Sequence, residues 1–146
     1  MAKHTYPFVT FKDDQGNVIR GPASYLPVRI TNPETGLSVV NYALVDTGAD
    51  NCVIPKPIAV ALGHNFDGQD VRSAKTQGVS GSTPVYMHTF DLELLTADRA
   101  KVFFSVSNVL ISCVAPEIPV LLGVADCLKR FTLTVNYPAG TTMLQY

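Results

Sequence analysis

One short segment constrains the fold of this chain more than any other: an apolar run that ends in a carboxylate and a tight turn. Residues 42–45 (YALV) lead directly into Asp46-Thr47-Gly48, and a second apolar segment (VIP) begins at Val53. A short apolar run bounded by turn residues is typical of a buried strand, and a glycine allows the chain to turn sharply after it. The segment therefore predicts two strands joined by a loop that presents one acid, Asp46, at the floor of a cleft.

The composition favours a β-rich domain. Apolar residues make up 47% of the 146 residues and charged residues 16%, with ten Gly and ten Pro. Val, Thr, Tyr and Phe prefer strands, whereas Gly and Pro mark turns. A chain of this length forms one domain that buries about two-thirds of its unfolded surface, so it needs no disulfide. We predict an all-β domain with one or two short helices.

Turn residues divide the chain into hairpins. The expected strand pairs are 8–11 with 18–20, 25–30 with 37–45, 83–95 with 100–109, and 131–135 with 142–145. A short helix is expected at 57–63, because Pro57 suits a first turn and Gly63 suits a left-handed cap. A further helix-like stretch covers 125–130.

Charge and cysteine content exclude several classes of partner. The net charge is −1 and the chain has no Lys/Arg cluster, so we expect no nucleic-acid partner. Its three cysteines have no C-x-x-C spacing and no histidine placed to complete a zinc site. We therefore expect buried free thiols, no metal and no cofactor.

The sequence contains no apolar segment of signal-peptide length at its start and none that reaches the roughly 20 residues that a bilayer requires. We expect no membrane segment in this chain. A reducing cytoplasm fits these features, as does a domain excised from a larger protein.

A second motif, Leu121-Leu122-Gly123, stands far along the chain from Asp46. The order of strand, Asp-Thr-Gly-Ala, glycine-rich hairpin, two apolar residues with Gly, short helix and final strands resembles the retropepsin-like aspartic proteases, the single-domain relatives of pepsin. The resemblance covers about residues 26–145 and implies a retropepsin-like acid protease barrel. We assign residues 26–146 to this domain and residues 1–25 to an N-terminal extension, a β-hairpin of unassigned role.

The resemblance also implies an activity, the hydrolysis of peptide bonds by an endopeptidase. The chemistry needs two carboxylates about 3 Å apart that share one proton, because like charges so close cannot both ionise. This chain has a single Asp-Thr-Gly. A twofold homodimer would supply the second Asp46, and a peptide or protein would be the substrate.

Roles for individual residues follow from the same resemblance. Asp46, Thr47 and Gly48 form the catalytic triplet, in which Thr47 would bond to the partner loop. A flap at 77–82 would close over the substrate with Val79 at its tip. The expected substrate-binding residues are Ala49, Asp50, Gly78, Val79, Ser80 and Gly81. Behind the catalytic loop, Leu121, Leu122 and Gly123 would hold it rigid.

Several points stay open. Retroviral members often place Arg after the second glycine to pair with the residue that matches Asp50, but this chain has Val124 there. The missing arginine could be replaced by Arg29, Lys129 or Arg130. Alternatively, the dimer could rely on the terminal strands. Asp126 is expected to start a helix and His64 to face solvent, and the histidines form no triad because no nucleophile-elbow serine accompanies them.

Two other functions remain to be compared with the protease. One is a non-catalytic peptide-binding or dimerisation module with the same fold; the intact Asp-Thr-Gly-Ala favours the enzyme over it, and the missing arginine slightly weakens the case for the enzyme. The other is a structural β-barrel domain, which leaves the paired motifs unexplained. Taken alone, Asp46 could also be a turn-capping residue, and the glycine-rich tip an ordinary mobile hairpin.

Overall fold

The computed structural model describes residues 2–64, 72–78, 81–114 and 118–146. Within these ranges the chain is built almost entirely of strands, so the predicted all-β class is confirmed. The strands are β1 (Lys3–Pro7), β2 (Val9–Lys12), β3 (Val18–Ala23), β4 (Tyr25–Thr31), β5 (Ser38–Val45), β6 (Val53–Pro55), β7 (Arg72–Gly78), β8 (Gly81–Leu95), β9 (Val102–Val114), β10 (Val120–Leu122), β11 (Thr132–Asn136) and β12 (Thr141–Gln145). The helices are α1 (Lys56–Ala61) and a 3₁₀ turn, Leu128–Arg130.

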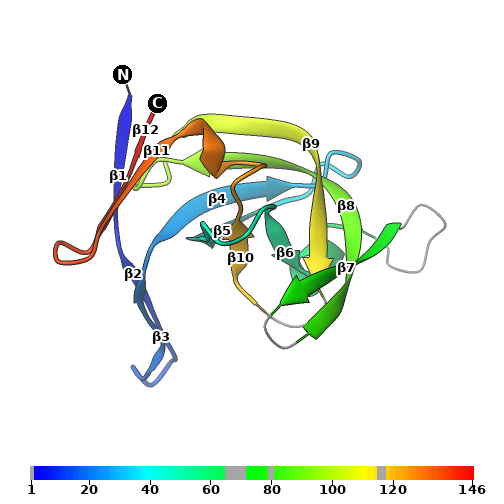
Figure 1. Ribbon diagram of the computed structural model, residues 1–146, viewed down its shortest axis with the longest axis horizontal. Helices are drawn as coiled ribbons and strands as arrows, with labels where there is room; N and C mark the ends of the chain where they lie inside the picture. The colour runs from blue at the N-terminus through cyan, green and yellow to red at the C-terminus, as the bar shows by residue number, and fades with distance from the viewer. Residues whose placement is uncertain (1, 65–71, 79–80, 115–117) are drawn as a thin grey trace.

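The largest sheet closes on itself as a barrel (Figure 1). Its strands follow the order β4-β5-β10-β6-β9-β8. The last strand, β8, pairs with the first, β4, through Val28–Leu94 and Ile30–Leu92. Closure removes free sheet edges, which otherwise invite pairing with other chains. Of the seven strands of this sheet, β7 alone lies outside the ring, next to β8.

The core explains why β4 is apolar at nearly every position. It pairs with β5 on one side and β8 on the other, and Leu26, Val28 and Ile30 are fully buried. Phe90, Leu92 and Leu94 of β8 alternate into the same core, as a strand with one buried face should. The barrel is therefore filled by side chains.

A second sheet joins the two ends of the chain. β1 pairs with β12, and β12 pairs with β11. Tyr6 of β1 is buried in the main core and donates a hydrogen bond of 2.7 Å to the carbonyl of Leu95. Burial raises the pKa of the Tyr6 hydroxyl well above its usual range. Residues 3–7 thus share their core with the barrel.

Two local expectations are wrong. Residues 125–130 form no α-helix: the amides of Leu128 and Lys129 donate to carbonyls five residues back and that of Arg130 to the Cys127 carbonyl three residues back, and only the short 3₁₀ turn forms. His64 does not face solvent: its ring lies 4.4 Å from that of His88 and 4.6 Å from that of Phe90. Burial lowers the pKa of both histidines.

Candidate active site

Strand β5 delivers Asp46 to the surface. β5 runs parallel to β10, with Val45 opposite Leu122. The Asp46 amide then donates a 3.1 Å hydrogen bond to the Leu122 carbonyl, which extends the ladder by one step. Asp46 is half-buried, whereas Thr47 and Gly48 are exposed. The strand end is thus fixed while the residues just beyond it are accessible.

The turn after Asp46 folds back on its carboxylate. The Gly48 amide donates to Oδ1 of Asp46 at 3.0 Å, and the Ala49 amide donates to the Asp46 carbonyl at 3.2 Å. A Cβ at position 48 would lie 3.3 Å from that Oδ1, tighter than most side-chain contacts. Glycine therefore allows the close approach of backbone and carboxylate.

Behind this turn lies the second motif. Leu121 pairs with Val53 of β6, so β10 is inserted between the two strands that enter and leave the Asp46 loop. A Cβ built on Gly123 would lie 2.2 Å from the backbone carbonyl carbon of Asn51, so only glycine fits. The Gly123 amide donates to Sγ of Cys52 at 3.4 Å. The predicted supporting residues are in direct contact with the loop.

The residues that follow Gly123 hold the far half of the loop. The Val124 amide donates to the Ala49 carbonyl at 2.9 Å, and the Ala125 amide to the Asp50 carbonyl at 2.6 Å. Oδ2 of Asp126 accepts the Cys52 amide at 2.8 Å. The expectation that Asp126 starts a helix is wrong, since the 3₁₀ turn begins two residues later, at Leu128, and the Asp126 carboxylate contacts the loop. The sequence feature that could have indicated this contact is the position of Asp126, three residues after Gly123 of the second motif.

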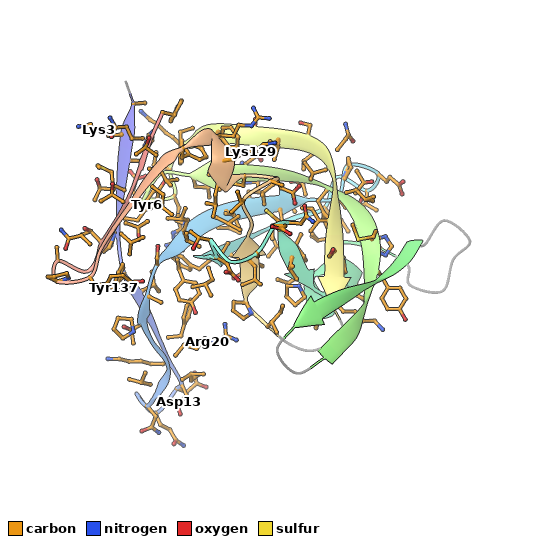
Figure 2. All side chains as sticks on the ribbon, viewed as in Figure 1. Lys3, Tyr6, Asp13, Arg20, Lys129 and Tyr137 are labelled. Atoms are coloured by element: carbon orange, nitrogen blue, oxygen red, sulfur yellow. The ribbon has the colours of Figure 1, made fainter. Side chains whose placement is uncertain are left out.

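The Asp50 side chain is exposed, and no ion pair involves it in the described part of the chain. Arg29, one of the candidate partners, pairs with Glu93 at 3.3 Å. Lys129 and Arg130 are exposed at the 3₁₀ turn, and Figure 2 shows Lys129 on the upper side of the barrel. None of these three cations pairs with Asp50 within the monomer.

The predicted flap corresponds to the hairpin of β7 and β8. These strands pair from Arg72–Met87 to Gly78–Gly81. β7 is the edge strand of the seven-stranded sheet, beside β8 (Figure 1). Val79 and Ser80, expected at its tip, lie outside the described residues.

The cysteines do not offer a competing nucleophile. Cys52, Cys113 and Cys127 are buried and unpaired by disulfides, as expected. Burial raises the pKa of the Cys52 thiol to about 11 and those of Cys113 and Cys127 to about 12. The thiolate is the reactive form, so these three side chains stay inert near neutral pH.

Comparison with known proteins bears on the family and the fold. The sequence model of the retroviral aspartyl protease family matches residues 23–136. Among solved structures, a retropepsin-like aspartic protease from Rickettsia conorii superposes with a TM-score of 0.57 at 15% identity, over 99% of this chain and 94% of that one. No curated protein matches the chain significantly. No helix in the described ranges is long and apolar enough to cross a bilayer. The family match spans most of the chain, which therefore belongs to the retroviral aspartyl protease family and has the retropepsin-like fold.

Proposed function

We propose that this protein is an aspartic endopeptidase whose active site forms between two copies of the chain, each of which contributes Asp46. The observation that carries the proposal is the Asp46 loop itself. Its carboxylate lies at the end of β5, oriented by the Gly48 amide, and residues 122–126 brace the loop from behind. An accessible carboxylate on a rigidly held loop can hold a reacting water in a fixed position.

The chemistry needs one acid and one base at the same place. Two Asp46 carboxylates about 3 Å apart would share a single proton, since like charges at that distance cannot both ionise. The ionised carboxylate takes a proton from water, which attacks the peptide carbonyl carbon. The protonated carboxylate gives its proton to the carbonyl oxygen. Return of a proton to the amide nitrogen then releases the two fragments.

The dimer is part of the mechanism because one chain supplies one Asp-Thr-Gly. Thr47 and Gly48 are exposed in the isolated chain, which leaves them available to a second copy. The Thr47 hydroxyl would donate a hydrogen bond to the partner loop or accept one from it. Such a contact is isologous, so both loops make it at once.

The substrate would be an extended peptide. It would lie between the Asp46 loop and the β7–β8 hairpin as an added strand, with alternate side chains in pockets on either side. Ala49 and Asp50 would face it from the loop, and Gly78, Val79, Ser80 and Gly81 from the flap. Asp50 is exposed, and its carboxylate would accept backbone amides of the substrate.

A peptide-library cleavage assay from acid to neutral pH tests the proposal, with wild type compared against Asp46→Asn. The substitution keeps the side-chain shape but removes both the base and the shared proton, so cleavage should vanish while the melting temperature changes little. Asp91→Asn is a matched control, because Asp91 lies on β8 and accepts the Asn108 amide. Cleavage by Asp46→Asn at a tenth of the wild-type rate would refute the assignment. Peptide binding without any cleavage by wild type would favour the non-catalytic binding module.

A further inference from the structure

The hairpin of β2 and β3 stands apart from the barrel. Its two strands form a sheet of their own, and Figure 1 shows the hairpin extending away from the body of the molecule. Its turn is well defined, because Oδ1 of Asp13 accepts the amides of Gln15 and Asn17 at 2.9 and 2.8 Å. We call residues 9–23 the N-terminal arm.

Only the base of the arm is packed. The Phe11 ring meets Tyr25 edge-on at 4.9 Å and Tyr42 at 6.1 Å. Towards the tip, Val18 and Ile19 are 59% and 63% exposed. Neighbouring residues of a strand point to opposite faces, so the arm presents a branched apolar side chain on each face. An isolated hairpin is only marginally stable in water. We therefore expect another surface to cover the exposed apolar side chains at the tip of the arm.

The arm begins beside the catalytic loop. The carbonyl of Ser24, the residue after β3, accepts a 2.9 Å hydrogen bond from the amide of Val45. Val45 immediately precedes Asp46. Tyr25 pairs with Leu44 in the next step of the ladder. On the proposed function, a twofold axis passes between the two Asp46 loops. Such an axis would bring the bases of the two arms near each other.

The charges of the arm are balanced and complementary to themselves. Lys12 and Arg20 are positive and Asp13 and Asp14 negative, which gives two minus two, or no net charge. All four side chains are exposed, and the one ion pair within the described residues lies elsewhere, between Arg29 and Glu93. A neutral arm does not suit nucleic acid or an anionic membrane. Away from the axis, a twofold contact pairs a residue with a different residue of the partner, so an arm that carries both signs can bind its own copy.

We propose that the N-terminal arm packs against the arm of a second copy of this chain and forms part of the dimer interface next to the active site. Val18 and Ile19 supply the apolar contact, and Arg20 of one arm pairs with Asp14 of the other. A stable interface buries about 800 Å² on each partner, more than the short Asp46 loops can supply alone. The arms add the missing surface.

Sedimentation over a concentration series tests the arm. The double variant Val18→Asp/Ile19→Asp should raise the dimer dissociation constant at least tenfold, because it places charge where apolar contact is expected. The control is Val60→Asp, a residue 51% exposed on α1, which should leave the constant unchanged. Circular dichroism at low concentration checks that both variants fold. A wild-type dissociation constant for the double variant would overturn the proposal.

Charge reversal tests the pairing of arm with arm. Asp14→Lys and Arg20→Asp should each weaken the dimer, and the two together should restore it, because the reversed pair is again complementary. Failure of the double reversal to recover affinity would refute this pairing. Sedimentation does not depend on cleavage, so the two proposals fail separately. An arm-dependent dimer without activity would refute the protease, whereas an active dimer indifferent to the arm would refute the arm contact.

Discussion

At the scale of single residues, the Asp46 loop is held mainly by backbone groups. Leu122, Val124 and Ala125 each contact it through a main-chain carbonyl or amide. The side chain of Val124 therefore does not enter these bonds. Asp126 is the exception, since its carboxylate accepts the Cys52 amide. The far end of the loop thus depends on one charged side chain that is not expected to touch substrate.

Asp126 can be tested through the shape of its side chain. Asp126→Ala removes the acceptor and leaves the Cys52 amide without it, which should lower the free energy of unfolding by about 1–3 kcal/mol and kcat by about tenfold. Asp126→Asn keeps an acceptor oxygen and should retain most of both. Chemical denaturation and steady-state kinetics measure the two effects. Equal behaviour of the Ala and Asn variants would show that the hydrogen bond is unimportant.

Gly123 gives a purely steric prediction. An added methyl would fall 2.2 Å from the Asn51 carbonyl carbon, and this neighbour is backbone that cannot rotate away. Gly123→Ala should therefore lower the free energy of unfolding by about 3 kcal/mol, at the upper end of overpacking costs. Gly21→Ala is the control, because a Cβ there meets nothing within 4 Å. Similar denaturation midpoints for the two variants would contradict the clash.

At the scale of elements, local signals predicted most of the strands. The hairpins around 13–17, 32–36 and 136–140 form where turn residues indicated them. Strand β9 runs to Val114, past the expected end at 109, and its last residues pair antiparallel with β8 on one side and in parallel with β6 on the other. Parallel pairing with a distant strand leaves no local mark in the sequence. Likewise, the 125–130 stretch has a helical pattern, but Asp126 within it contacts a loop that is distant in sequence, since its bond to Cys52 spans a separation of 74 residues.

The β7–β8 hairpin carries the flap prediction. If it closes on substrate, Val79→Asp should raise KM and lower kcat/KM about tenfold or more, because a charge would replace the apolar contact that excludes water. The melting temperature should change by only a degree or two if the tip is exposed without substrate. Val79→Leu, which keeps an apolar tip, should stay close to wild type. Unchanged kinetics for Val79→Asp would show that this hairpin is not a lid.

At the scale of the whole molecule, the two ends of the chain are closed against each other. The Ala2 amide donates to the Tyr146 carbonyl at 3.0 Å, and both termini lie at the same end of the molecule (Figure 1). Both edges of β12 are occupied, by β1 on one side and β11 on the other. A second copy therefore cannot add a strand at β12 while this sheet is intact. The dimer that the proposed mechanism requires would use the Asp46 loops together with an outer edge or the N-terminal arm.

The oligomeric state decides the mechanism. One Asp46 per chain cannot share a proton with itself, so activity per chain should fall on dilution below the dimer dissociation constant. Mixed dimers with one Asp46→Asn subunit should be inactive, because the remaining carboxylate has no partner to exchange the proton with. The pH–rate profile of wild type should be bell-shaped, and its two limbs belong to the coupled pair rather than to either Asp46. Sedimentation and cleavage measured over one concentration series provide the test. A monomer with full specific activity would overturn the two-carboxylate mechanism, whereas activity that follows the dimer fraction places the active site at the interface.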